Sequence, residues 1–301
     1  MSVTFIGPEV EARLDWIGLS DAIEAAHSLP RAQVSDSFLY RGADTLLNRA
    51  AWIDGFGLLV KVVTVNPGNG ATGLPAVNGA VNVMDDATGQ LEAMVDFHLL
   101  TKWKTAGDSL LATRKLARPD ARRFLICGAG NVARSMVTAY RAAFPQAEIS
   151  IWNRTHAGAQ ALADAVGATA VPDLADAVAG ADVIATTTMA TEPYLRGDWI
   201  APGTHLDLIG AYRPDMREVD DVALQKARVF CDARATTVHH IGEFRDPVAR
   251  GVLREEDIIA DYYDLPSGCF ARQSADEITI SKNGGGAHLD LMTARYILSR
   301  A

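Results

Sequence analysis

The stretch FLICGAGN, residues Phe124–Asn131, decides the fold of this chain, because an apolar strand runs directly into a glycine-rich turn. The turn has the form G-x-G-x-x-A. Gly128 permits the tight bend, Gly130 lets the backbone approach a pyrophosphate, and the small Ala133 lets the following helix pack closely on the strand. Apolar residues recur at helical spacing after the turn, so the helix N-terminus would face the phosphates. This context predicts a bound dinucleotide rather than a strand-to-helix turn without a ligand.

A second strand, in Glu148–Thr155 (EISIWNRT), indicates which dinucleotide is bound. NAD-binding proteins place Asp or Glu at the end of this strand, where it bonds the ribose 2′-hydroxyl. Here the strand ends in the neutral Asn153 and the cationic Arg154, which would attract a 2′-phosphate. We therefore predict NADP(H) as the preferred cofactor and NAD(H) as the alternative. The residues assigned to the cofactor site are Gly128, Gly130, Asn131, Val132, Asn153, Arg154, Thr155, Thr187, Thr188, Gly210, Tyr212 and Gly284.

The composition argues against several classes of function. The net charge of −9 and the pI near 5.2 argue against a nucleic acid or an anionic membrane as a partner. The cysteines, Cys127, Cys231 and Cys269, form no C-x-x-C pair and no His/Cys cluster, so the sequence carries no metal signature and suits a reducing compartment. The N-terminus has no basic, apolar leader, and no apolar run approaches the length of a membrane span. We therefore expect a cytoplasmic protein without a metal.

Strands and helices alternate from residue 124 onward. Further strands are predicted at Asp182–Thr188, Thr204–Gly210, Arg228–Ala233 and Glu277–Lys282. This alternation is typical of a doubly wound α/β domain, so we predict a Rossmann nucleotide domain. A final helix, His288–Ser299, is expected to leave that domain and pack on the first one.

The N-terminal part has a different pattern. A helix is predicted over residues 20–29, with Ser20 or Asp21 as its cap, and another over 99–117. Between them, turn residues separate strand-like runs and favour antiparallel pairing; the clearest runs are Leu58–Val65, Val77–Met84 and Leu91–Phe97. The expected division is an α+β domain of residues 1–118 with 284–301 and a nucleotide domain of residues 119–283.

Three cations of the N-terminal part are candidates for holding an acidic substrate. Lys61 lies inside the apolar strand LLVKVVTV, where burying an unpaired charge is costly. Arg31 follows a proline, and Lys104 lies in the helix predicted over 99–117. From spacing alone, Lys61 also fits an outward-facing position with a snorkelling side chain, and Arg31 and Lys104 fit solvated surface charges. Asp108, four residues after Lys104, fits an ordinary ion pair along the helix.

Five stretches of the chain resemble the motifs of one known family and occur in the same order. They are KVVTVNPGN (61–69), DATG (86–89), LLTKWKTAGDSLLATRKLARPDARRFLICGAGNVA (99–133), IGAYRPDMREVD (209–220) and SKNGGGAHLDL (281–291). Together they strongly resemble the ornithine cyclodeaminase/mu-crystallin family over nearly the whole chain. The resemblance implies a homodimer in which each subunit has a nucleotide domain and a substrate and dimerisation domain that the C-terminal helix completes. It also implies a small 2-amino or 2-imino acid as substrate.

The resemblance assigns roles to the three cations. The family's Pro-Arg element corresponds to Pro30-Arg31 and its strand lysine to Lys61. Its helix arginine falls on Lys104, which keeps the charge but loses the bidentate fork. Arg31, Lys61 and Lys104 are then expected to bind the substrate carboxylate. Lys61 is also a candidate proton donor, because burial and neighbouring positive charge lower the pKa of a lysine.

Two departures from the family pattern bear on the reaction. Tyr212 stands where cyclodeaminases and the alanine dehydrogenase carry the Asp that serves the amino or imino group. Because a phenol with a pKa of about 10 is a poor replacement for that Asp, full cyclodeamination is disfavoured. Asp108 stands where the family has a small or uncharged residue. It either approaches the imine nitrogen and stabilises the iminium or pairs with Lys104, and the sequence does not separate these roles.

These features favour an NAD(P)H-dependent reductase of cyclic ketimine carboxylates. Δ1-pyrroline-2-carboxylate, which would give L-proline, is the first substrate expectation, and piperideine carboxylate is the second. Lys61 and Asp108 are the candidate catalytic residues. An ornithine cyclodeaminase or an amino-acid dehydrogenase is the alternative of the same class. A non-catalytic, NADP-dependent binder of small ligands, as mu-crystallin is, is the alternative of another class.

Overall fold

The computed structural model describes residues 3–301, and the chain divides into two compact units. The first unit consists of Met1–Lys104 with Gly286–Ala301, and the second of Thr105–Gly285. The division after Lys104 falls inside a helix, whereas the sequence places the boundary at the end of that helix. No proline lies near Lys104, and Gly107 lies inside the continuous helix, so no turn residue marks this division in the sequence.

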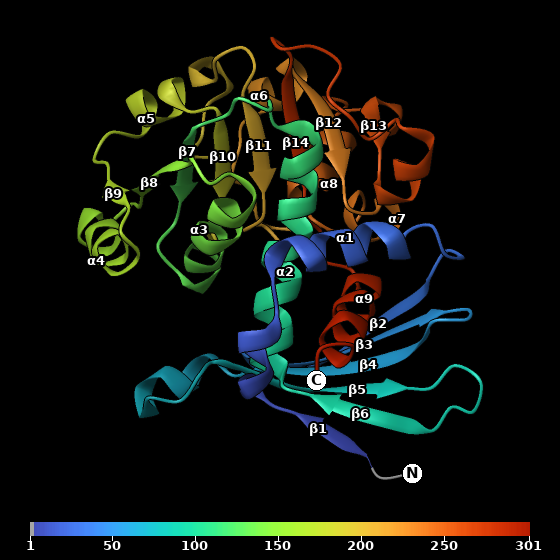
Figure 1. The fold of residues 1–301 in the computed structure, drawn as a ribbon. Coiled ribbons are helices and arrows are strands. Elements are labelled where there is room, and N and C mark those ends of the chain that lie inside the picture. Colours follow the sequence, from blue (N-terminus) through green and yellow to red (C-terminus); the bar gives the residue numbers. More distant parts are fainter. Residues whose placement is uncertain (1–2) are drawn as a thin grey trace. The chain divides into compact units, whose positions relative to one another are not determined.

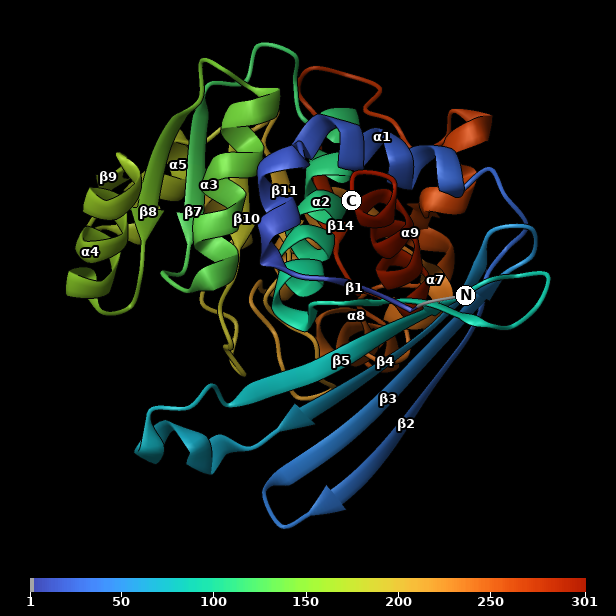
Figure 2. The ribbon, with the colours of Figure 1, turned by 60° about the horizontal axis from the view of Figure 1, so that its bottom comes forward.

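The first unit is built on a sheet of six strands in the described chain, in the order β1-β6-β5-β4-β3-β2 (Figure 1; β2 to β5 also in Figure 2). Its strands are β1 (Thr4–Ile6), β2 (Gln33–Arg41), β3 (Asp44–Ile53), β4 (Gly57–Val65), β5 (Val77–Met84) and β6 (Leu91–Val95). Neighbours pair antiparallel except β1 and β6, which run parallel. The predicted strands at β4 and β5, and their antiparallel pairing, are confirmed.

Two helices of this unit pack against each other, and the second of them packs on the sheet. The helices α1 (Trp16–Ala26) and α9 (Ala287–Leu298) contact each other, and α9 also contacts β2, β3 and β4. The predicted cap at Ser20 or Asp21 is wrong, because α1 begins earlier: the Asp15 side chain accepts a hydrogen bond from the backbone nitrogen of Gly18 at 2.5 Å. Ser20 is buried inside the helix instead.

The helix α2 (Phe97–Leu116) corresponds to the helix predicted over 99–117, and residues 97–104 of it belong to the first unit. The strand predicted to reach Phe97 ends at Val95, because Asp96 caps α2: its Oδ1 accepts a hydrogen bond from the backbone nitrogen of Leu99 at 2.7 Å. The sequence does not predict β2, since QVSDSFLYR lacks a regular alternation of apolar and polar residues. Short 3₁₀ helices at Pro8–Arg13 and Pro67–Thr72 complete this unit.

The second unit contains a parallel sheet of eight described strands, in the order β13-β12-β14-β11-β10-β7-β8-β9 (Figure 1). The strands are β7 (Arg123–Cys127), β8 (Glu148–Trp152), β9 (Thr169–Ala170), β10 (Val183–Thr186), β11 (His205–Leu208), β12 (Ala227–Cys231), β13 (Ile258–Ala260) and β14 (Ile278–Lys282). The strand order reverses between β7 and β10, which is where doubly wound sheets bind nucleotides. The predicted doubly wound α/β domain is confirmed.

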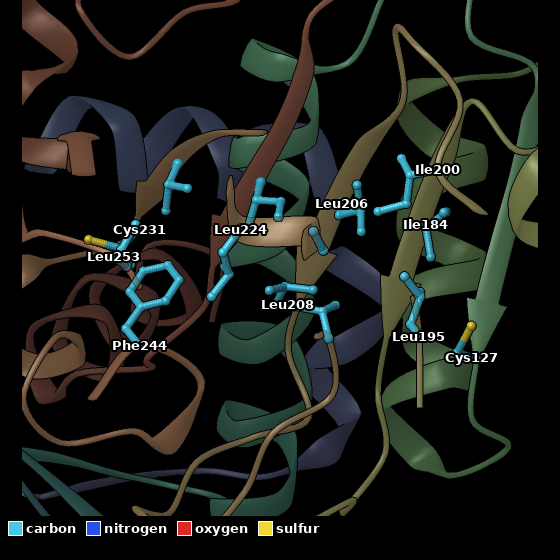
Figure 3. Close-up of a cluster of buried hydrophobic side chains, with 14 of the residues drawn as sticks. Cys127, Ile184, Leu195, Ile200, Leu206, Leu208, Leu224, Cys231, Phe244 and Leu253 are labelled. Carbon is cyan, nitrogen blue, oxygen red and sulfur yellow. The ribbon is translucent and has the colours of Figure 1, made fainter. Parts of the chain in front are cut away.

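Helices lie on both faces of this sheet. They are the rest of α2 with α3 (Asn131–Ala143), α4 (His156–Val166), α5 (Leu174–Gly180), α6 (Asp221–Lys226), α7 (Arg234–Thr237) and α8 (Gly242–Ala249). Alternate side chains of β7 point to opposite faces. Phe124 packs on Tyr140 of α3 with ring centroids 4.9 Å apart, while Cys127 joins a core cluster that includes Leu224 of α6 and Phe244 of α8 (Figure 3). Short 3₁₀ helices lie at Gly197–Trp199, Glu255–Asp257 and Tyr262–Ser267.

Three further observations concern residues 3–301 as a whole. No helix in this range is both long and apolar enough to cross a membrane. The same range contains no group of three His, Cys, Asp or Glu side chains arranged to hold a metal ion. Cys127, Cys231 and Cys269 are free, and only Cys269 is exposed.

Candidate functional site

The side chain of Lys61 points to the buried face of the first unit's sheet. Residues of β4 alternate between buried and half-buried positions, and Lys61 shares the buried set with Leu59 and Val63. Only 4% of Lys61 is exposed. The outward-facing, snorkelling position that spacing alone allowed is therefore wrong.

Two side chains of the first unit hold the Lys61 ammonium. Its Nζ donates to Oδ1 of Asp290 at 2.9 Å and to Oγ1 of Thr101 at 3.0 Å. The ring of Phe97 lies 5.1 Å from Nζ, which is within cation–π range. An ammonium carries three N–H donors, so one donor remains for a ligand.

Burial and neighbouring cations weaken the charged state of Lys61. Burial lowers the pKa of Lys61, and the positive charge of Lys104 lowers it further, while Asp290 opposes both effects. Although burial raises the pKa of Asp290, the charges of Lys61, Lys104 and Arg49 lower it below its usual value. The pair is thus an ammonium facing a carboxylate inside a cluster of additional positive charge.

The buried ring of His288 shows which cations share this cluster. Burial lowers the pKa of His288 to about 3, and the charges of Lys104, Arg49 and Arg31 contribute to the lowering. At neutral pH His288 is therefore neutral. Lys104 is buried and Arg31 is exposed. The structure brings Arg31, Lys61 and Lys104 into one region of the first unit, and a region with this excess of positive charge suits a carboxylate.

Sequence reasoning missed Arg49 and Asp290 as members of this cluster. Arg49 of β3 stands directly opposite Lys61 in the antiparallel pairing, so both side chains lie on the same face. Its guanidinium bonds Asp36 of β2 at 2.7–3.1 Å. The register of the β3–β4 hairpin would have placed Arg49 beside Lys61. The strand β2, whose Asp36 holds Arg49, has no clear alternation of apolar and polar residues in the sequence. Asp290 lies in a quoted motif, SKNGGGAHLDL, yet nothing in the spacing connects it to Lys61.

In the second unit, the glycine-rich turn has the form that a pyrophosphate needs. Gly128 has a φ of 125°, and a Cβ at this position would collide with Oγ1 of Thr187. Gly130 is the N-cap of α3, no side chain caps that helix, and the space around the Gly130 Cα is open. The first N–H groups of α3 are therefore available to an anion, so this turn fits the predicted dinucleotide.

The residues predicted to select the cofactor lie at the end of β8. Arg154 and Thr155 are exposed, and the Asn153 side chain donates to the backbone oxygen of Thr155 at 3.0 Å. No carboxylate occupies Asn153–Thr155, where one would repel a 2′-phosphate. Arg154 is thus exposed and adjacent to the predicted ribose position.

The loops that follow β10 and β11 meet on the buried carboxylate of Glu218. Its Oε1 accepts from N and Oγ1 of Thr188 at 2.8 and 2.7 Å. Its Oε2 accepts from Oγ1 of Thr186 at 2.7 Å and from the backbone nitrogens of Gly210 and Ala211 at 2.8 and 3.2 Å. One carboxylate therefore fixes the loops that carry the predicted cofactor residues Thr188 and Gly210.

Two more buried charges support Glu218. Glu243 of α8 accepts hydrogen bonds from the backbone nitrogens of Glu218 and Val219 at 2.9 and 3.1 Å. Burial and the charge of Glu218 raise the pKa of Glu243 to about 7, although Lys282 opposes the shift. Lys282 is fully buried and donates to the backbone oxygens of Leu208 and Asn283 at 2.8 and 2.7 Å.

Other predicted residues lie elsewhere in the second unit. The backbone nitrogen of Gly284 donates to Asp232 at 2.9 Å, which anchors the loop after β14. Tyr212 is 58% exposed, and the Arg213 guanidinium lies 5.6 Å from its ring. The side chain of Asp108 is fully buried. Burial, together with the charge of Asp108, raises the pKa of Tyr262, whose hydroxyl donates to the Asp108 backbone oxygen at 2.6 Å.

Comparison with known proteins gives a consistent picture. The model of the ornithine cyclodeaminase/mu-crystallin family matches residues 52–301. The Δ1-pyrroline-2-carboxylate reductase of Paracoccus denitrificans is 48% identical over 296 residues, which cover 96% of this chain and 94% of the relative.

Two solved structures share the fold over almost their whole length. The Δ1-pyrroline-2-carboxylate reductase of Thermococcus litoralis, in complex with NADH and L-proline, superposes with a TM-score of 0.89 at 25% identity, covering 99% of this chain and 97% of the other. An archaeal alanine dehydrogenase dimer with bound NAD gives a TM-score of 0.91 at 27% identity, covering 100% and 96%.

Proposed function

Because this chain belongs to the ornithine cyclodeaminase/mu-crystallin family, we propose that it is an NADPH-dependent reductase that converts Δ1-pyrroline-2-carboxylate to L-proline. The observation that carries the proposal is the buried Lys61 ammonium, which lies among other cations and keeps one donor for an anionic ligand. The relative that is 48% identical carries this activity in its name, which supports the same substrate class here.

The cations hold the substrate by its carboxylate. Lys61 donates its remaining N–H, and Arg31 and Lys104 add charge-assisted contacts. Such contacts are stronger than neutral hydrogen bonds and fix the plane of a small imino acid. Arg49 adds positive charge behind Lys61 while its own guanidinium is held by Asp36.

Reduction of the imine requires a hydride at carbon and a proton at nitrogen. A bound NADPH supplies the hydride. Lys61 is the proposed proton source: the same N–H that faces the bound imino acid would pass its proton to the nitrogen and leave a neutral amine. Burial and Lys104 lower the pKa of the ammonium and so ease this release. Two alternative roles are proposed for Asp108: it contacts the iminium nitrogen, or it pairs with Lys104.

The cofactor preference is part of the proposal. The solved relatives bind NADH or NAD, which supports a nicotinamide dinucleotide as the cofactor here. We assign NADPH on account of Arg154, which is exposed at the end of β8 with no carboxylate beside it. The glycine-rich turn, with Asn131 and Val132, would hold the pyrophosphate, and Thr155, Thr187 and Tyr212 would complete the site.

A homodimer is also part of the proposal, and we assign the first unit to substrate binding and dimerisation. The edge strand β2 is exposed along its whole length, and Leu39 and Trp52 on the first unit's sheet are 63% and 46% exposed. Long exposed edges and apolar faces of this kind are usually covered in the assembled protein. The archaeal alanine dehydrogenase is a dimer. Light scattering that gives the mass of one chain would contradict this element.

A panel of substrates tests the proposed function. The purified protein is given cyclic imines with five- and six-membered rings, and linear 2-oxo acids with ammonia, each with NADPH or NADH. The highest kcat/KM is expected for Δ1-pyrroline-2-carboxylate with NADPH. Higher efficiency with pyruvate and ammonia would identify an amino-acid dehydrogenase. Binding of NADPH without turnover of any imine would identify a non-catalytic binder.

A further inference from the structure

Asp290 is the buried anion of the cation cluster. It lies in the first turn of α9, and none of its surface is exposed. Its Oδ1 accepts from the Lys61 ammonium at 2.9 Å, while none of residues 3–301 donates a hydrogen bond to its Oδ2. Burying a carboxylate oxygen without a donor is unfavourable, so the position calls for an explanation other than stability.

The burial of Asp290 decides how it acts. Its Oδ2 is closed to solvent and its Oδ1 accepts from the Lys61 ammonium, so Asp290 acts through Lys61. Its partner Lys61 keeps one N–H that neither Asp290 nor Thr101 accepts. Because Asp290 and Thr101 take two of the three donors, they also fix the direction of the third.

The charges around the pair would otherwise expel a proton from Lys61. Lys104 of α2 and Arg49 of β3 are cations that act on it, and His288 of α9 is neutral at physiological pH. Asp290 is the anion that opposes them. Loss of its charge would leave Lys61 buried beside like charges with no counter-ion.

We propose that Asp290 is a positioning residue of the reduction: it keeps Lys61 charged and aims its third N–H at the bound imino acid. This inference rests on the proposed function for the identity of the substrate. The pairing of Asp290 with Lys61 has consequences for any small carboxylate that Lys61 binds, so it can be tested separately.

The test is the pH dependence of the variant Asp290→Asn. The amide keeps the shape and one acceptor but removes the charge. We expect the alkaline limb of its kcat/KM profile for Δ1-pyrroline-2-carboxylate to move to lower pH by about one to three units, the size of the effect that a neighbouring opposite charge has on a pKa. A purely structural role would scale the rate equally at every pH and leave the limb in place.

A binding measurement provides a readout that needs no turnover. Calorimetry measures the binding of pyrrole-2-carboxylate to protein saturated with NADP⁺. This planar anion has no imine for the protein to reduce. At low pH, the affinity of Asp290→Asn for this anion should match that of the wild type. As the pH rises, the affinity of the variant should be lost first. Identical pH curves for the two proteins would overturn the inference. Wild-type protein that binds this anion but reduces no cyclic imine would overturn the proposed function instead.

Two further variants guard against a folding artefact. Thr293→Val alters another buried polar side chain of α9 whose Oγ1 has no hydrogen-bond partner among residues 3–301, and its pH profile should match the wild type. If Asp290→Asn does not fold, Lys61→Met/Asp290→Asn removes both charges and should fold better than either single variant, because no buried charge is left unpaired. A double variant no more stable than the singles would contradict the coupling.

Discussion

Glu218 accepts two hydrogen bonds from Thr188, from its backbone nitrogen at 2.8 Å and from its hydroxyl at 2.7 Å. The same carboxylate accepts from the backbone nitrogen of Gly210 at 2.8 Å. Thr188 and Gly210 follow adjacent parallel strands, and a Cβ on Gly210 would collide with the backbone of Thr188. The loops at this edge of the sheet are therefore tied by a buried side chain that is not itself predicted to touch the cofactor.

Glu218→Gln should weaken cofactor binding. The amide has one acceptor oxygen and places a donor group against the N–H and O–H groups that now converge on the carboxylate. Loss of one hydrogen bond to a charged group costs about 1.5–3 kcal/mol. We therefore expect the Kd for NADPH to rise by about ten- to a hundredfold. Glu277→Gln is the control: Glu277 directly precedes β14 and pairs with Arg228 of β12. Its loss should leave the Kd for NADPH unchanged. Equal Kd values for wild type and Glu218→Gln would contradict this role.

Lys61→Met should nearly abolish imine reduction while NADPH binding stays intact. Fluorescence titration of NADPH and steady-state kinetics measure the two properties in one preparation. The substitution also leaves Asp290 as an unpaired buried charge, which typically costs about 3–5 kcal/mol of stability. The melting temperature should therefore fall with the activity. If the variant kept most of its activity, Lys61 would have no essential role in imine reduction. Loss of NADPH affinity together with activity would indicate misfolding.

Arg154→Ala should narrow the preference for NADPH over NADH. One charge-assisted contact to a phosphate contributes about 1.5–3 kcal/mol, so the kcat/KM ratio of the two cofactors should fall by about ten- to a hundredfold. The kcat/KM with NADH itself should hardly change, because the adenosine 2′-hydroxyl carries no charge. A wild type that uses NADH more efficiently than NADPH would refute the assignment.

Glu243 should make the folded protein less stable as the pH rises through the slightly acidic range. Its pKa is raised by burial and by Glu218 from 4.5 to about 7. Between these values the folded protein holds a proton that the unfolded chain has lost, so the free energy of unfolding falls as the pH rises from about 4.5 to about 7, by on the order of 3 kcal/mol. Glu243→Gln should flatten the plot of melting temperature against pH between pH 5 and 8. Parallel plots for the wild type and the variant would refute the raised pKa of Glu243.

The doubly wound unit was predictable because its elements carry local signals. The turn at Gly128 and the apolar strands leading to Thr186 and Leu208 follow patterns that depend on neighbouring residues. The same signals led to the cofactor residues predicted at the strand ends. The start of α1 was wrongly predicted: Ser20 is buried, and Asp15 caps the helix through the nearby Gly18. The backbone nitrogen of Asp15 also donates to the hydroxyl of Tyr296, a contact distant in sequence that the local pattern does not show.

The candidate site was predictable only in part. Lys61 was recognisable, because a lysine inside an apolar strand needs an anion. Its partner Asp290 was not, since the two lie 229 positions apart and are joined by tertiary packing alone. Glu218 appeared in the sequence as an ordinary polar residue, and the convergence of two loops on its carboxylate depends on the fold.

The most direct test of the central claim compares two substrates in one preparation. The family resemblance puts Tyr212 where cyclodeaminases are expected to carry an Asp for the amino group, so the protein is predicted to act on a preformed imine and not on ornithine. The purified protein should consume NADPH when given Δ1-pyrroline-2-carboxylate and should release no ammonia and form no proline from L-ornithine with NAD(P)⁺. Robust release of ammonia from ornithine, or no oxidation of NADPH with the imine, would contradict the account.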